Sequence, residues 1–232
     1  MALCNGDPPQ KPGNPRRLRY LIQSRLGEDM ESQFVTVVEP YDTTPFIKQV
    51  RRLKVEHDAD PNSVVAVAVE LADGTTDILI NCEERTSVKV EGGIEFDGQV
   101  GMIRLVNGEM KLMRMSNATL LSYGDTKLAA ERAAYEGTVS AIDASDPASN
   151  LVMLDPPLSQ DADLVGQTIH FDNDLPLDTS YEIKAMTPEG ISTGDITIVQ
   201  GFKDTSDFDA GYKYLVNVGD RYMVPCTVGL DR

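Results

Sequence analysis

The chain contains no tryptophan, and aromatic side chains are scarce in general, with six Phe and eight Tyr among its 232 residues. The interior must therefore be filled by Val, Leu, Ile, Met and Ala, which predicts an aliphatic core. A sugar-binding surface that stacks rings on its ligand would have to rely on Tyr. This scarcity argues against a simple lectin.

Cysteine and long apolar runs are also in short supply. Cys4, Cys82 and Cys226 are widely spaced and form no CxxC or Cys/His pattern, so we expect free thiols, neither a disulfide framework nor a zinc site. The longest apolar runs, such as Val64–Val69, are far shorter than a membrane span, and Met1–Pro15 lacks the apolar core of a signal peptide. No membrane partner is expected.

Basic residues are few, with 21 Lys and Arg against 37 Asp and Glu, which gives a formal net charge of −16. Such a charge repels polyanions at long range, so nucleic acid is excluded as the expected partner, and an anionic glycan meets the same objection. Hydrophobic residues make up 41% of the chain and charged residues 25%, as in a folded protein. The length suits one domain, or one domain with an appended lobe.

Short strands and turns dominate the pattern. The dipeptides Asp73-Gly74 and Asn107-Gly108 each lie between β-branched or alternating segments, which is the strongest local signal for a β-hairpin. Alternation predicts one apolar face on the first hairpin, made of Val65, Val67, Val69, Leu71, Ile78 and Ile80. The predicted fold is all-β, an antiparallel β-sandwich built from hairpins, with a smaller appended β lobe and little helix.

Only Asp125–Tyr135 has the composition of a helix, with Asp125 as a candidate N-cap. The expected organisation has four parts. Residues 1–15 form a Pro- and Gly-rich linker, 16–131 the main β-sandwich, 132–190 a small β lobe, and 191–232 strands that return to the main sandwich.

Several short sequence segments, in their order and spacing, resemble the β-rich region that follows the helical toroid in heparinase II/III-like polysaccharide lyases. They cover nearly the whole chain: Arg17–Arg25, Phe34–Leu53, Ala68–Cys82, Ala134–Asp143, Gln200–Asp204 and Tyr214–Leu230. In Phe34–Leu53, two β-rich runs flank Pro40, Tyr41 and Pro45. The resemblance is to the C-terminal part of such enzymes.

The resemblance implies β-elimination on uronate-containing glycans, carried out by a helical toroid of the same parent chain. It implies that the β region supports that toroid and lines the glycan cleft. The family's His-bearing strands are expected to precede this sequence, so no catalytic position is carried over to a residue here. The implied partners are an anionic polysaccharide and the N-terminal toroid, the implied location is secreted or periplasmic, and no cofactor is implied. A module that docks on a toroid should expose an apolar patch.

The candidate substrate-binding residues form a basic strip of Lys48, Arg51, Arg52 and Lys54, with Tyr41 nearby. Lys48, Arg52 and Lys54 share one strand parity and Arg51 has the other. Arg offers a planar fork that suits carboxylate or sulfate groups. The alternative is a solvated strand face whose charges pair with nearby acids.

The other polar residues and clusters do not form a recognisable catalytic or metal-binding motif. His57 lies in an acidic turn and is expected to be solvated, and His170 is expected to make a structural hydrogen bond, with Asp172 as one possible partner. The acidic groups Asp172/Asp174 and Asp204/Asp207/Asp209 suggest calcium, but their spacing does not match an EF-hand. No catalytic residue and no metal ligand is assigned.

Two alternatives remain open at this point. One is a carbohydrate-binding module that acts alone through exposed Tyr side chains such as Tyr20, Tyr41 or Tyr123. The other is a structural interaction domain.

Overall fold

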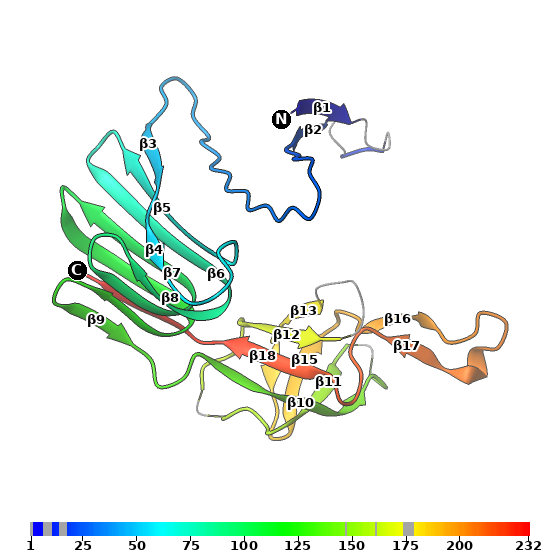
Figure 1. Cartoon of the computed structure of the whole chain (residues 1–232). Coiled ribbons are helices and arrows are strands. Elements are labelled where there is room, and N and C mark those ends of the chain that lie inside the picture. The colour runs from blue at the N-terminus through cyan, green and yellow to red at the C-terminus, as the bar shows by residue number, and fades with distance from the viewer. Residues whose placement is uncertain (1, 7–10, 14–17, 147, 161, 174–178) are drawn as a thin grey trace. The chain divides into compact units, whose positions relative to one another are not determined.

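A computed structural model describes residues 2–6, 11–13, 18–146, 148–160, 162–173 and 179–232, and nearly all of its regular structure is β (Figure 1). The chain forms two compact units, residues 1–38 and residues 39–232. Every strand pair is antiparallel, and the described helix is a single 3₁₀ turn, η1 (Phe208–Ala210). The predicted antiparallel all-β fold is confirmed.

The first unit contains one two-stranded sheet. Strand β1 (Ala2–Gly6) pairs with β2 (Leu18–Ile22), so part of the segment expected to be a linker is a strand. Residues 23–38 contain no strand, although Phe34–Val38 was predicted to be β-rich. A β-propensity run becomes a strand only when a neighbour completes its hydrogen bonds, and none of the described residues of this unit pairs with Phe34–Val38.

The second unit begins with an eight-stranded sheet. Six of its strands follow one path, in the order β19 (Thr227–Asp231), β8 (Glu109–Tyr123), β7 (Ile94–Val106), β6 (Thr75–Val90), β5 (Val64–Leu71) and β3 (Ile47–Arg52). Two short strands complete it, β4 (Val55–Glu56) on β6 and β9 (Thr126–Ala129) on β8. The predicted turns at Asp73-Gly74 and Asn107-Gly108 connect β5 to β6 and β7 to β8, as expected.

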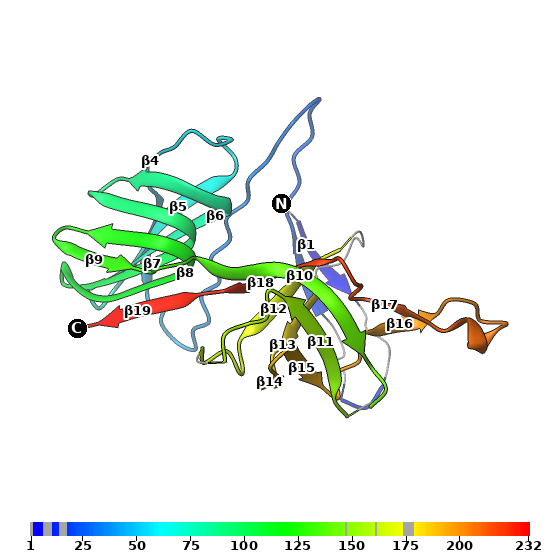
Figure 2. The same ribbon diagram turned by 90° about the horizontal axis from the view of Figure 1, so that it is seen from below.

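The long strands of this sheet bend. The pairing of β6 with β7 shifts between Asn81 and Thr86, and that of β7 with β8 shifts between Asp97 and Gly98. A Cβ atom on Gly101 would lie 3.1 Å from Cε2 of Phe96, five residues earlier on the same strand. An extended strand rises about 3.3 Å per residue, so this contact requires a sharp turn in β7. The long strands of this sheet curve (Figure 2), and their inward-facing side chains, almost all of them aliphatic, form one core.

The predicted apolar face of the first hairpin is wrong. Ile78 and Ile80 pair with Ala68 and Ala66, and these four side chains belong to the core. The odd-numbered residues Val65, Val67 and Val69 lie on the opposite face. Even-numbered residues of β5 lie opposite even-numbered residues of β6, so the odd-numbered valines and the even-numbered isoleucines face opposite sides of the sheet.

The predicted helix at Asp125–Tyr135 is also wrong. Thr126–Ala129 forms β9, which turns back onto β8 through Gly124 at a positive φ of 56°. Leu128 lies opposite Leu121 and is buried in the core. Burial of this side chain outweighs a helix propensity of a few tenths of a kcal/mol per residue.

A seven-stranded sheet follows, with its own core. Its order is β13 (Thr179–Glu182), β12 (Thr168–Asp172), β18 (Arg221–Pro225), β10 (Ala134–Asp143), β11 (Asn150–Asp155), β15 (Gly190–Gly194) and β14 (Ala185–Met186). Ile169, Ile183, Ile191 and Val224 are fully buried there. A separate hairpin, β16 (Val199–Phe202) and β17 (Tyr212–Tyr214), carries η1 in its loop.

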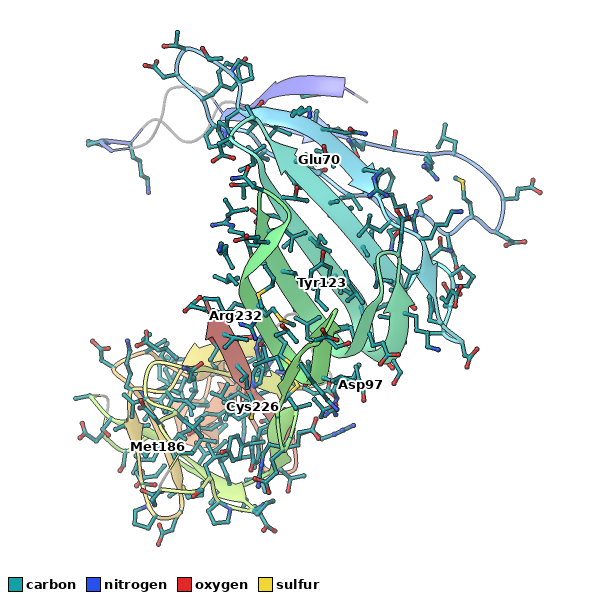
Figure 3. All side chains as sticks on the ribbon, turned by 90° about the vertical axis from the view of Figure 1, so that its left-hand side faces the viewer. Glu70, Asp97, Tyr123, Met186, Cys226 and Arg232 are labelled. Carbon is teal, nitrogen blue, oxygen red and sulfur yellow. The ribbon has the colours of Figure 1, made fainter. Side chains whose placement is uncertain are left out.

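The return of residues 191–232 to the main sandwich differs from expectation. Only β19 joins the eight-stranded sheet, whereas β18 lies within the seven-stranded one. Between them, Cys226 accepts a hydrogen bond from Asn117 N–H (3.1 Å) and donates its own N–H to Ala133 O (2.8 Å). Figure 3 labels Cys226 at this crossing.

Substitution of Gly98 tests the bend. A Cβ atom there would lie 2.1 Å from Ala118 Cβ and 2.5 Å from its Cα, so Gly98→Ala should destabilise the protein by about 1–3 kcal/mol through overpacking. Gly201→Ala is the matched control, because no atom lies within 4 Å of its Cβ position. Urea unfolding followed by circular dichroism measures both variants. Equal stability of Gly98→Ala and the native protein would show that the two strands do not approach this closely.

Candidate functional site

The basic strip lies on and just after β3, an edge strand of the eight-stranded sheet. Lys48 sits where the pairing of β3 with β5 shifts, between Ile47 and Gln49. Arg51 lies opposite Ala68, on the core-facing side, and Arg52 lies opposite Val67, on the outer side. The two neighbouring arginines therefore face different surroundings.

Arg51 is engaged in the structure. Its guanidinium forms an ion pair with Glu91, and the other oxygen of Glu91 accepts the backbone N–H of Lys54 at 3.1 Å. These two contacts, the Lys54 hydrogen bond first and the Arg51 hydrogen bond second, lower the pKa of Glu91. Glu91 thus joins the β6–β7 turn to Arg51 of β3 and to Lys54 just after it. The Arg51 side chain therefore stabilises the fold, and we do not propose it as a ligand-binding residue.

Arg52 and Lys54 line an open hollow of about 600 Å³. Its apolar lining comes from Leu53, Val55, Pro61 and Val64, and its other polar side chains are Glu56 and His57. Among the described residues, Lys48, Arg52 and Lys54 form no ion pair, and their side chains are exposed. Two of the predicted binding residues therefore meet at one concave surface.

Tyr41 is not brought to this hollow. It lies exposed in the loop before β3, whose ends are joined by Glu39. The Glu39 carboxylate accepts the backbone N–H of Phe46 (2.6 Å) and that of Ile47. Tyr41 therefore belongs to a closed neighbouring loop.

His57 is partly buried, not solvated as expected. It lines both the basic hollow and a second one of about 480 Å³, whose lining includes Glu56, Lys89, Glu95 and Asp97. Its Nδ1 atom is buried and has no hydrogen-bond partner among the described residues. No local signal predicts this, because Lys89, Glu95 and Asp97 belong to β6 and β7, which lie far from His57 along the chain.

The other predicted polar groups make local contacts. His170 Nδ1 lies 2.8 Å from Ser180 Oγ on the neighbouring strand, which is a structural hydrogen bond as expected. Asp204 accepts from Ser206 N–H (2.8 Å) and Oγ (2.7 Å), and Asp207 from Asp209 N–H (3.1 Å). Asp174 lies outside the described residues. Within the described part of the chain, no three His, Cys, Asp or Glu side chains gather as metal ligands would.

The β16–β17 hairpin carries an exposed aromatic cluster that was not predicted from the sequence. Phe202 and Tyr212 face each other across the β16–β17 hairpin with ring centroids 5.0 Å apart, and Phe208 packs on Phe202 at 4.6 Å. Their exposed fractions are 37%, 47% and 66% for Phe202, Tyr212 and Phe208. The available signal was three rings around one Asp-rich loop. Of the Tyr residues expected to form a platform, Tyr123 packs against the core (Figure 3), and the side chain of Tyr20 lies outside the described residues.

The outer face of the eight-stranded sheet carries apolar side chains. Val50, Leu79 and Val100 lie on this face and are 44%, 40% and 42% exposed. Ion pairs Arg104–Asp77 and Arg114–Asp231 also lie on it. Arg52 belongs to the same face, so the apolar patch adjoins the basic strip.

The three cysteines are free thiols in the structure, as predicted. Burial raises the pKa of Cys82 to about 11 and also raises that of Cys226, which favours the unreactive thiol form. No helix among the described residues has the length and hydrophobicity to cross a membrane.

Comparisons with protein-family models, curated proteins and solved structures find no match to this chain. Any functional assignment therefore depends on the chain's own residues and on the resemblance of its sequence phrases.

Replacement of Glu91 tests the anchoring of the strip. Glu91→Gln removes the ion pair with Arg51, so it should lower the melting temperature at neutral pH. Because folding lowers the pKa of Glu91, its stabilisation is present above the ordinary value of 4.5 and is lost as pH falls through the lower folded value. The difference between native protein and variant should therefore shrink in acid.

Melting temperatures of the native protein and of Glu91→Gln, measured from neutral pH down to below the ordinary value of 4.5, give this difference. Glu83→Gln is the control, since the exposed Glu83 side chain makes no hydrogen bond or ion pair with the described residues. A pH-independent difference for Glu91→Gln would contradict the role given to Glu91.

Proposed function

We propose that this chain is a non-catalytic β module of a heparinase II/III-like polysaccharide lyase. In this proposal it supports the helical toroid of its parent chain and lines the cleft that holds a uronate-containing glycan. The toroid carries out β-elimination, no cofactor takes part in this module, and the parent enzyme acts outside the cell or in the periplasm.

The observation that carries the proposal is the hollow beside β3. Arg52 and Lys54 border an apolar-floored depression of about 600 Å³ and have no ion-pair partner among the described residues. A sugar ring presents apolar C–H faces, and a uronate adds a carboxylate that Arg can bind through two parallel hydrogen bonds. Such contacts act at short range, where the overall negative charge is largely screened by salt.

The apolar outer face supports the docking part of the proposal. Val50, Leu79 and Val100 expose aliphatic surface next to Arg52. Exposed apolar patches rimmed by polar residues are typical of protein–protein contact surfaces. A helical partner on this face would extend the wall beside the basic hollow.

Removal of the three unpaired charges tests glycan binding. The variant Lys48→Ser/Arg52→Ser/Lys54→Ser should lose retention in a native gel that contains alginate or another uronan, with affinity lower by about tenfold or more. The control variant Lys127→Ser/Lys203→Ser/Lys213→Ser removes equal charge from exposed positions elsewhere. Retention of the first variant that equals that of the native chain would reject the glycan contact at β3.

A second candidate function, a carbohydrate-binding module that acts alone, is favoured by the aromatic cluster. Phe208 packs on Phe202 at a tilt and Tyr212 stacks on Phe202, and both rings remain exposed, so they offer aromatic surface on which a sugar could stack. The loop that holds Phe208 is fixed by the hydrogen bonds of Asp204 and Asp207. Its carboxylates favour an uncharged sugar over a uronate.

Removal of the outer rings separates the two functions. Phe208→Ala and Tyr212→Ala should each weaken retention in gels that contain a neutral polysaccharide, such as galactomannan or hydroxyethyl cellulose, because each removes one exposed ring of the cluster. Phe46→Ala, which removes an exposed ring elsewhere, should have no effect. If the native chain migrates freely through every neutral gel, this second function fails, while the uronan result stands by itself.

A further inference from the structure

A third hollow, of about 460 Å³, lies where the chain enters the seven-stranded sheet. Its lining includes Arg132 just before β10, Tyr135 and Glu136 at the start of that strand, Pro156 and Pro157 after β11, and Tyr222 of β18. Sites for small molecules have volumes of about 300–1,000 Å³ and combine apolar walls with a few polar groups. The hollow has both properties, and it shares no lining residue with the basic hollow beside β3.

The walls of this hollow are fixed by packing and by one hydrogen bond. The Tyr222 hydroxyl donates to Pro156 O at 2.6 Å, which joins β18 to the segment after β11. A Cβ atom on Gly137 would lie 2.4 Å from Asp155 O and 2.7 Å from Tyr222 Cε1, so only glycine allows this approach. The rings of Tyr222, Pro156 and Pro157 therefore form a preformed apolar wall.

Arg132 supplies the one cationic side chain of the lining. Its guanidinium carbon lies 5.0 Å from the centroid of the Tyr135 ring, a cation–π contact that orients the group. Its ion-pair partner is Glu131 at 3.9 Å, too distant for a hydrogen bond, and its N–H groups donate to none of the described residues. A guanidinium held against a ring keeps its donor edge available for a ligand.

The remaining charge of the lining is already compensated. Glu136, the one carboxylate among the lining residues, accepts a hydrogen bond from Arg85 at 2.6 Å. Arg132 is therefore left to complement an acidic group of a ligand, beside walls that suit a ring.

We propose that this hollow binds a ring that carries one carboxylate, with Arg132 gripping the carboxylate and the Tyr and Pro side chains packing against the ring. The proposal does not depend on the function assigned to the strip beside β3. Two sources share this ligand chemistry, an acidic sugar and an aromatic carboxylic acid, and the probes chosen below distinguish them.

Nuclear magnetic resonance titration of the full chain with glucuronate, glucose and benzoate tests the proposal. Glucuronate should cause saturable shifts at residues of this hollow, and glucose should not. A response to glucuronate alone assigns the site to acidic sugars, and a response to benzoate as well extends it to aromatic acids.

Two variants locate the binding. Arg132→Gln should weaken glucuronate binding by about tenfold or more, whereas Arg114→Gln, on another strand, should leave it unchanged. Tyr135→Phe keeps the ring under Arg132 and should bind as the native chain does, while Tyr135→Leu should bind less tightly. Comparable shifts with glucose, an unaffected Arg132→Gln variant, or no saturable shift with either acid would each overturn the proposal.

Discussion

The eight-stranded sheet depends on the bend in strand β7 that brings the Phe96 ring against Gly101. A side chain can reach a residue five positions away on its own strand only if the strand bends sharply between the two residues. The turn folds one sheet over its own core, which lets aliphatic side chains and a single Phe fill an interior without tryptophan. It also brings the β6–β7 turn beside the end of β3, where Glu91 holds Arg51 and Lys54.

The basic side chains of the strip differ in whether they have an ion-pair partner. Arg51 lies on the core-facing side, and its guanidinium forms an ion pair with the Glu91 carboxylate, which stabilises the fold. Arg52 and Lys54 face a hollow and have no ion pair among the described residues. Exposed cations beside a concave apolar surface can bind an anion at modest desolvation cost, since their own hydration is only partly removed. A strongly negative total charge is therefore compatible with a local group of exposed cations that form no ion pair with the described residues.

Local signals in the sequence predicted what local chemistry determines. The Asp-Gly and Asn-Gly turns gave the two hairpins, and the alternation of apolar residues gave the all-β class. The face of the first hairpin was wrong because it depends on register, and the helix at Asp125–Tyr135 was wrong because burial of Leu128 depends on Leu121 across the sheet. The aromatic cluster and the Arg132 hollow join residues from separate strands. The Arg132 hollow therefore lies in no short window of sequence, whereas the three rings of the aromatic cluster fall within residues 202–212.

The proposed contact of Arg52 and Lys54 with an acidic glycan can be tested by residue-specific chemical protection. The chain is treated with an arginine-selective and a lysine-selective reagent, with and without a uronan oligosaccharide, and each position is read by mass spectrometry. The account predicts that the oligosaccharide slows modification of Arg52 and Lys54 and leaves Lys127 unchanged. Equal modification of all three positions with and without the oligosaccharide would contradict it.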